Sequence, residues 1–221
     1  MEQIIAEQKA RELQIDKTQV VREYWELVIL KGLFDSSEGQ ALIFKGGTAL
    51  RLAYGSPRFS EDLDFSLIKD PFKGKFSQII KKIIAPFPDL FVTDLEEKYY
   101  TYWAEIKVTQ EYLPMPFRIK IEISKRKVRN YQWKVHLLSS PASILQIVGQ
   151  VAALEQIYRD KLACLKERAK PKDLFDLWYI SQKLRVPYTA RRIPSKKRDV
   201  VRELRKYVPK DFWPAIEDLA K

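Results

Sequence analysis

The chain has 221 residues, 46% of them hydrophobic, which is enough to bury a sizeable core in one large domain or a compact pair of domains. Its 40 Lys and Arg residues outnumber 29 Asp and Glu residues, and the net charge of +11 favours a polyanionic partner such as RNA. The alternative is a basic protein that has no such partner. The single cysteine excludes an internal disulfide, and neither a basic-then-apolar leader nor a membrane-spanning apolar run is present, so we expect a cytoplasmic protein with no membrane partner.

The first third of the chain alternates between helical and strand patterns. The spacing of apolar residues predicts helices over residues 2–14, 17–33, 48–54 and 73–85, and strands over residues 41–44 and 62–67. Asp16 precedes the second helix and is the predicted N-cap. These elements place the polar motifs described below at the ends of short buried strands.

The rest of the chain divides into a strand-rich part and a helical part. Alternating apolar residues predict strands over residues 102–108, 117–123 and 133–137, and the segments after Pro141 predict helices over residues 142–147, 154–168, 172–184, 195–206 and 209–220. No Gly/Ser-rich linker separates the two parts. We therefore expect a soft boundary near residue 140, between a core of residues 1–140 and a helical half of residues 141–221.

The most informative motif is the pair of carboxylates at Asp62 and Asp64. In a strand, residues two apart point to the same face, so both carboxylates project together while Leu63 enters the core. Neighbouring carboxylates repel each other unless a cation neutralises them, and hard divalent ions prefer oxygen ligands. The pattern predicts a site for Mg2+ or Mn2+.

A glycine pair precedes these carboxylates by about 15 residues. Gly46 and Gly47 permit close backbone approach, so the following amides and the Thr48 hydroxyl are expected to bind phosphate oxygens at a helix N-terminus. Lys45 points either to phosphate or to solvent. An ordinary strand-to-helix turn is the alternative for a lone glycine pair, and the carboxylate motif behind it makes that alternative weaker.

Two separated segments together resemble a known family. Residues 45–50 (KGGTAL) with residues 58–65 (RFSEDLDF), and residues 160–163 (DKLA) with residues 172–177 (KDLFDL), are similar to the AbiEii family, the toxin halves of AbiE-like and MenT-like toxin–antitoxin systems. The likeness spans roughly residues 17–180. It implies an α+β fold of the DNA polymerase beta-like nucleotidyltransferase superfamily, with a mixed-sheet core followed by a helical C-terminal half.

The resemblance also implies roles for residues outside the glycine and carboxylate motifs. It places Lys161 on a helix from which a flexible point charge reaches over a triphosphate, whereas a solvated helix lysine is the ordinary interpretation. Asp173 and Asp176 share a helix face, and we expect Asp173 to form an ion pair with Lys161 or Arg168 that orients the site.

Arg58 and Ser60 belong to the active-site rim in the resemblance, where a serine binds phosphate or is modified. The equally weighted alternative is that Ser60 caps a turn and Arg58 pairs with Glu61.

Glu122 is the candidate third carboxylate. It shares a strand face with Arg118 and Lys120, because the isoleucines between them face the core. Glu122 is expected to act as a third metal ligand or general base, and a cross-strand salt bridge to Lys120 or another basic residue is an equally weighted alternative. His136 has no Cys or His companion, so a zinc site is not expected there.

The C-terminal region adds a run of cations. Arg191, Arg192, Lys196 and Lys197 lie near tyrosines, a composition that suits binding to a phosphate backbone with stacking on bases, although a solvated basic helix face is as common.

These features lead to one preferred function and two alternatives. We expect a metal-dependent nucleotidyltransferase that transfers nucleotides from a nucleoside triphosphate to RNA, with tRNA preferred, as the toxin of a type IV system with an AbiEi-like antitoxin. One alternative is transfer to a small molecule or a protein hydroxyl. The other is a non-catalytic module that binds nucleic acid or a partner, which the intact carboxylate pair argues against.

Overall fold

The computed structural model describes residues 1–168, 170–188 and 196–220. The strands are β1 (Leu42–Lys45), β2 (Asp62–Leu67), β3 (Leu90–Glu97), β4 (Thr101–Val108), β5 (Phe117–Ser124), β6 (Trp133–Ser140) and β7 (Ser143–Ala152). The helices are α1 (Gln3–Glu12), α2 (Lys17–Asp35), α3 (Gly46–Tyr54), α4 (Phe76–Ile84), α5 (Leu154–Arg168), α6 (Pro171–Leu184), α7 (Lys197–Leu204) and α8 (Trp213–Leu219), with short 3-10 turns at Gly39–Ala41 and Lys210–Phe212.

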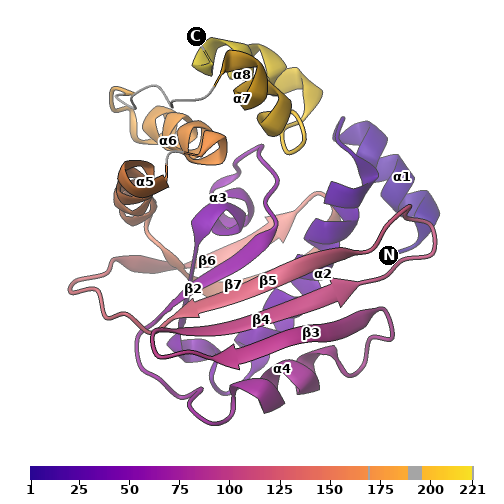
Figure 1. The fold of residues 1–221 in the computed structure, drawn as a ribbon, viewed down its shortest axis with the longest axis vertical. Coiled ribbons are helices and arrows are strands. Elements are labelled where there is room, and N and C mark those ends of the chain that lie inside the picture. The colour runs from indigo at the N-terminus through magenta and orange to yellow at the C-terminus, as the bar shows by residue number, and fades with distance from the viewer. Residues whose placement is uncertain (169, 189–195, 221) are drawn as a thin grey trace.

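The strands form one mixed sheet in the order β3-β4-β5-β2-β1-β7-β6. β2 runs parallel to β5 and antiparallel to β1, while β1 runs parallel to β7. The short central strands β1 and β2 are therefore enclosed on both sides by longer ones. This places the glycine motif after β1 and the carboxylates of β2 at the middle of the sheet (Figure 1).

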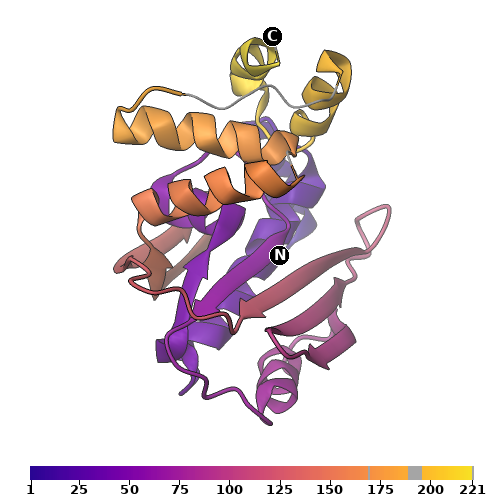
Figure 2. The ribbon, with the colours of Figure 1, turned by 60° about the vertical axis from the view of Figure 1, so that its left-hand side comes forward.

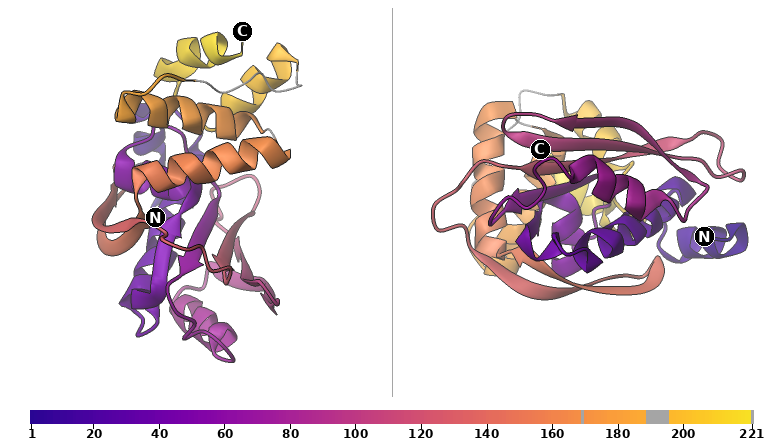
Figure 3. Two further views of the ribbon diagram at one scale, coloured as in Figure 1. Left: turned by 90° about the vertical axis from the view of Figure 1, so that its left-hand side faces the viewer. Right: turned by 90° about the horizontal axis from the view of Figure 1, so that it is seen from below.

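Helices cover the sheet unevenly. α2 and α4 pack on one face, where their apolar side chains join those of β2, β4 and β5 in the main core. α5 and α6 lie side by side near the central strands, with α7 and α8 beyond them (Figures 1 and 2). Figure 3 shows the same C-terminal helices gathered at one end of the molecule. The arrangement confirms the predicted mixed-sheet core followed by helices.

The local signals behind several elements are visible in the structure. The Asp16 carboxylate accepts a hydrogen bond from the Thr18 amide at 2.8 Å, which confirms the predicted N-cap of α2. Tyr102, Ala104 and Ile106 are fully buried, as the alternation along β4 predicts. No helix in the described part of the chain is long and apolar enough to cross a membrane.

One predicted element is wrong. Residues 142–147 were expected to be helical, but Ser143–Ala152 forms β7, which pairs with β6 and with β1. The short window contains helix-compatible residues, and pairing on both sides outweighs that weak local preference. Because β7 belongs to the sheet, the core sheet continues past residue 140 to Ala152.

Candidate active site

Two neighbouring strands bring the predicted carboxylates to one face of the sheet. β2 carries Asp62 and Asp64 on the face opposite Leu63 and Phe65, which are fully buried. The parallel register of β2 and β5 places Glu122 beside Asp64. Three carboxylates therefore project from adjacent positions on the same side of the sheet.

The electrostatics of this face favour a bound cation. Burial, and next the nearby Asp62 carboxylate, raise the pKa of Asp64 to about 6. Lys45 lies opposite Asp64 in the antiparallel register of β1 and β2, and its charge partly counteracts this rise in pKa. A site that disfavours two neighbouring negative charges is stabilised when a cation enters.

The donor set suits a hard divalent ion with open positions. Among the described residues, no group of three or more His, Cys, Asp or Glu side chains converges to hold a metal ion. Asp62 and Asp64 are the two carboxylates that fit Mg2+ or Mn2+, which commonly take one or two carboxylates and complete their coordination with phosphates and water. Glu122 as a third ligand stays a prediction.

The alternative ion pair for Glu122 is not formed by its strand neighbours. Arg118 pairs with Glu105 at 2.9 Å, and the Lys120 ammonium lies 5.8 Å from the centre of the Trp103 ring. Glu122 itself is exposed on the open face of β5. Its carboxylate is therefore available to a substrate or a metal ion.

The two glycines are needed because side chains from other segments lie directly against them. Gly46 adopts a φ of +79°, and a Cβ there would collide with the Asp64 carboxylate. A Cβ on Gly47 would collide with the Arg58 guanidinium and approach the Ser60 hydroxyl oxygen to 2.8 Å. The glycine pair thus lets the start of α3 approach both the carboxylate strand and the Arg58 side chain.

Thr48 differs from the expectation. Its side chain is fully buried, and its hydroxyl donates a hydrogen bond to the Asp62 carbonyl oxygen at 2.6 Å. The hydroxyl therefore ties α3 to the start of β2 instead of facing phosphate. The backbone amides at the start of α3 are the groups of this turn that could bind phosphate.

We expect Gly47→Ala to lower the free energy of unfolding by about 1–3 kcal/mol and to reduce activity, because the new Cβ forces the buried Arg58 guanidinium to move. Urea unfolding measures the first effect. Gly74→Ala is the matched control: its Cβ would meet open space, so only the strain of a φ of +70° contributes, about 1 kcal/mol. Equal stability losses in the two variants would contradict the close contact at Gly47.

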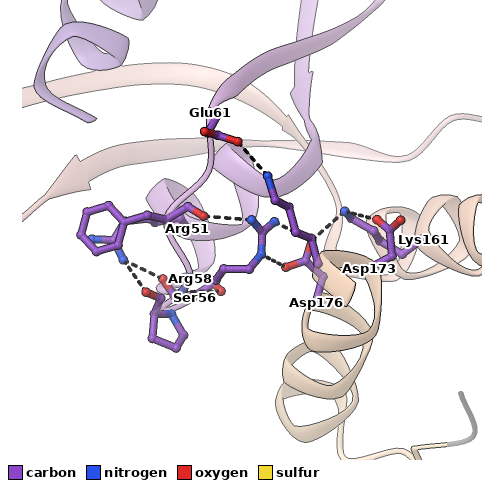
Figure 4. Close-up of polar contacts among 10 residues, drawn as sticks. Arg51, Ser56, Arg58, Glu61, Lys161, Asp173 and Asp176 are labelled. Carbon is purple, nitrogen blue, oxygen red and sulfur yellow. Dashed lines mark hydrogen bonds and ion pairs between the residues drawn. The ribbon is translucent and has the colours of Figure 1, made fainter. Parts of the chain in front are cut away.

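A buried ion-pair cluster joins the loop before β2 to α5 and α6. The Arg58 guanidinium donates two hydrogen bonds to the Asp176 carboxylate, at 2.7 and 2.8 Å. The Lys161 ammonium contacts Asp173 at 2.8 Å and Asp176 at 2.6 Å. Figure 4 shows the side chains of Arg58, Lys161, Asp173 and Asp176 pointing toward one another. We define Arg58, Lys161, Asp173 and Asp176 as the ion-pair cluster.

The cluster tests three expectations. The predicted pairing of Lys161 with Asp173 is confirmed. Pairing of Arg58 with Glu61 is wrong, because Arg58 is 2% exposed and its guanidinium is committed to Asp176 and to the Phe59 carbonyl. Asp176, for which no partner was predicted, is the carboxylate that both cations share.

Paired charges shift the pKa values of the cluster in the expected directions. Burial alone would raise the pKa of Asp176, but Arg58 and Lys161 outweigh burial and lower it to about 2. Burial would likewise lower the pKa of Lys161, and the two carboxylates raise it instead. Asp176, Lys161 and Arg58 therefore keep their charges at neutral pH. Lys161 is also close enough to lower the pKa of Asp64, which places its charge near the carboxylate strand.

A second polar group lies at the start of β2. The Glu61 carboxylate accepts hydrogen bonds from Lys172 and from the Tyr207 hydroxyl, both at 2.8 Å, and Arg22 lies 3.6 Å away. The Phe59 amide also donates to the Tyr207 carbonyl oxygen at 2.7 Å. The segment after α7 is therefore anchored beside the carboxylate strand.

Arg51 on α3 fixes the loop that delivers Arg58. Its guanidinium donates to the carbonyl oxygens of Ser56 and Pro57, at 3.1 and 3.0 Å (Figure 4). It also pairs with Glu23 on α2. This connection fixes the path of the chain between α3 and β2. Ser60 follows in that loop and is half-buried against Gly47.

Sequence patterns did not indicate several contacts around the site. The Tyr131 hydroxyl, from the loop between β5 and β6, donates to Asp160 at 2.6 Å. Glu61, Lys172 and Tyr207 meet from three distant segments. The tyrosines carried no recognisable spacing, and although Glu61, Asp160 and Lys172 lie within recognised motifs, the spacing of those motifs does not specify these contacts. His136 packs edge-on against Tyr54, with the ring centres 4.8 Å apart.

The predicted cationic segment is described in part. Arg191 and Arg192 lie outside the described residues. Lys196 and Lys197 are both exposed at the start of α7, the helix that leads to Tyr207 and the site. Their contact with nucleic acid stays a prediction.

Comparisons with known proteins agree with the fold. The chain resembles JHP933 from Helicobacter pylori, with a TM-score of 0.57 and 24% identity over 76% of this chain and 68% of that one. It also resembles MenT4, the nucleotidyltransferase toxin Rv2826c from Mycobacterium tuberculosis H37Rv, with a TM-score of 0.59 and 19% identity over 89% of this chain and 68% of that one. No curated protein sequence matches. Residues 28–214 match the family described as nucleotidyl transferase AbiEii toxin of type IV toxin–antitoxin systems, and the chain therefore belongs to that family.

Proposed function

We propose that this nucleotidyltransferase toxin uses Mg2+ or Mn2+ to transfer nucleoside monophosphate from a nucleoside triphosphate to RNA, with tRNA as the preferred acceptor. The observation that carries the proposal is the placement of Asp62 and Asp64 on one sheet face, with Asp64 directly against Gly46 at the start of α3. Carboxylates for a divalent ion and amides for phosphate are thereby adjacent.

The reaction needs little covalent chemistry from the protein. An acceptor hydroxyl oxygen forms a bond to the α-phosphorus, the bond from that phosphorus to the bridging oxygen breaks, and pyrophosphate leaves with the electron pair. When bound, the divalent ion neutralises phosphate charge and lowers the pKa of the acceptor hydroxyl. The chain must then orient the two substrates and receive one proton.

Residues of the site divide these tasks. The amides at the start of α3 bind the phosphates, with the positive end of the helix directed toward them. Lys161, fixed by Asp173 and Asp176, supplies positive charge near the same phosphates. Glu122, exposed beside Asp64, is placed to accept the proton of the acceptor hydroxyl.

Charge supports RNA as the acceptor. The net charge of +11 favours a polyanion, and the exposed Lys196 and Lys197 lie on the segment that Tyr207 anchors to Glu61. Membership of a type IV toxin–antitoxin family implies an antitoxin partner, for which we propose an AbiEi-like protein. A tRNA acceptor places the reaction in the cytoplasm.

The destination of label from the nucleotide tests the proposal. Purified protein is incubated with Mg2+, each α-32P-labelled nucleoside triphosphate and total tRNA, and the wild type is compared with Asp62→Ala. We expect label in tRNA with the wild type alone, and the labelled nucleotide that gives it identifies the donor. Label in the protein or in a small molecule, with none in tRNA, would support the alternative acceptors and contradict RNA transfer.

We expect the double variant Lys196→Gln, Lys197→Gln to raise the KM for tRNA and to reduce the salt dependence of binding by roughly one to two charges in the slope. The KM for the nucleoside triphosphate should not change, because these lysines are exposed and lie outside the ion-pair cluster. Filter binding across a salt series measures the slope. Lys31→Gln, an exposed lysine of α2 paired with Asp35, is the control. An unchanged slope would exclude both lysines from the RNA surface.

A further inference from the structure

We propose that Trp103 on β4 is the platform on which the terminal base of a single-stranded RNA acceptor stacks. The inference rests on the proposed function, because it names the residue that positions the acceptor in that reaction. It starts from the register of three adjacent strands. Asp64 on β2 lies beside Glu122 on β5, and Glu122 lies opposite Trp103 on β4.

Because these partners share one face of the sheet, they form a row that leads away from the metal-binding carboxylates. Adjacent strands are about 4.8 Å apart, so the Trp103 backbone lies roughly 10 Å from that of Asp64. The β2, β5 and β4 ribbons lie next to one another in Figure 1. A nucleotide whose hydroxyl reacts near Glu122 therefore has its base within reach of Trp103.

The in-line geometry of the reaction places the acceptor on the side of β2 where β5 and β4 lie. The attacking and leaving oxygens of nucleotidyl transfer lie in line on opposite sides of the phosphorus. Gly46 and the start of α3 follow β1, which lies on one side of β2, and they mark the end where pyrophosphate leaves. β5 lies on the other side of β2, so the acceptor enters over Glu122 and Trp103.

The Trp103 ring is held in place and is partly exposed. Its indole N–H donates a hydrogen bond to the Asp94 carboxylate at 3.0 Å. Within the described chain, Trp103 belongs to none of the hydrophobic clusters, since its neighbours Tyr102 and Ala104 supply the buried face of β4. Because the indole is already anchored outside the core, stacking a base on it costs little side-chain entropy.

Cations flank this ring. The ammonium groups of Lys98 and Lys120 lie 5.6 and 5.8 Å from the ring centre. Lys98 also pairs with Glu96 at 3.2 Å, whereas Lys120 makes no ion pair with a described residue. An aromatic ring beside a cation is the combination that binds single-stranded nucleic acid, through base stacking and phosphate contact.

The face around Trp103 is open to such a ligand. α2 and α4 pack against the opposite face of this part of the sheet, and no described helix packs extensively over the face that carries Trp103. Glu105, the nearest acidic residue along β4 on that face, is already paired with Arg118. The site thus continues from Asp64 across β5 to an accessible aromatic surface.

Binding without turnover tests the inference. The probe is a six-nucleotide single-stranded RNA with a free 3′ hydroxyl and a 5′ fluorescein, and its affinity is measured by anisotropy with Mg2+ and no nucleoside triphosphate. We expect Trp103→Leu to weaken binding about tenfold or more, and Trp103→Phe to retain most of the affinity. Trp133→Leu is the matched control, because Trp133 is an exposed tryptophan on β6 at the opposite edge of the same sheet.

Kinetics of transfer separate the acceptor from the donor. Trp103→Leu should raise the KM for RNA and leave the KM for the nucleoside triphosphate unchanged. Equal RNA affinities for Trp103→Leu and the wild type, or a rise confined to the KM for the triphosphate, would overturn the inference. Failure of RNA labelling would contradict the proposed reaction. Anisotropy needs no catalysis, so the binding measurement still tests the role of Trp103 separately.

Discussion

Asp62→Asn and Asp64→Asn are each expected to lower the rate of nucleotidyl transfer by about a thousandfold. Each change removes a carboxylate from the two that fit a divalent ion, and Asn keeps the shape of the side chain without its charge. The fold should persist, because burial, and next the repulsion between Asp62 and Asp64, raise the pKa of Asp64, and each substitution removes one of these two charges. Initial rates at saturating substrate and the Tm of the metal-free protein measure the two effects.

A matched Asp→Asn substitution outside the site shows whether the loss of transfer activity is specific to the carboxylate pair. Asp35→Asn removes an exposed carboxylate at the end of α2, where Asp35 pairs with Lys31 at 2.6 Å. That variant should keep the wild-type rate and Tm. Activity of Asp62→Asn within about tenfold of wild type, with a normal Tm, would contradict the assignment of the carboxylate pair.

Asp176→Asn is expected to lower the free energy of unfolding by about 3–5 kcal/mol. Asp176 is the shared partner of Arg58 and Lys161, and all three are buried, so the substitution leaves two cations without their common counter-charge. Urea unfolding at pH 7 measures the change. Asp199→Asn is the control, because Asp199 forms an exposed pair with Arg202 at 3.1 Å and should cost less than about 0.5 kcal/mol.

The same substitution has a defined pH dependence. The pKa of Asp176 is lowered to about 2 in the folded state, from 3.8, so its ionised form stabilises the protein fully above pH 4. That contribution is lost as pH falls from about 4 toward 2. The difference in unfolding free energy between wild type and Asp176→Asn should therefore be constant from pH 7 to 5 and shrink below pH 4. A difference that does not shrink in acid would contradict the depressed pKa.

Local motifs predicted the chemistry of the site better than its connections. The glycine pair and the carboxylates lie within one short stretch, so strand and helix periodicity is enough to place them together. The pairing of Lys161 with Asp173 was predicted from the family resemblance, which rests on the motifs that carry these two residues. The Arg58–Asp176 ion pair joins residues 118 positions apart, a contact that only the packing of α6 onto the loop before β2 creates.

Strand register limited the remaining predictions. Alternation along β4 indicates that Trp103 faces away from the core, yet nothing in its own segment specifies that β4 lies next to β5 with Trp103 opposite Glu122. The same limit explains β7, which sequence patterns assigned to a helix. It forms a strand because it pairs with β1, which is far from it in sequence, and with β6, from which a turn separates it.

The mass of the acceptor RNA after reaction is the most direct test of RNA nucleotidyl transfer at the Asp62 and Asp64 site. A single purified tRNA is incubated with Mg2+ and the nucleoside triphosphates, with wild-type protein or Asp62→Asn, and its intact mass is measured by mass spectrometry. We predict that wild type increases the mass of the tRNA by whole nucleoside monophosphate units, with one pyrophosphate released for each unit added, and that Asp62→Asn does not. An unchanged tRNA mass while the protein itself gains nucleotide mass would contradict RNA transfer.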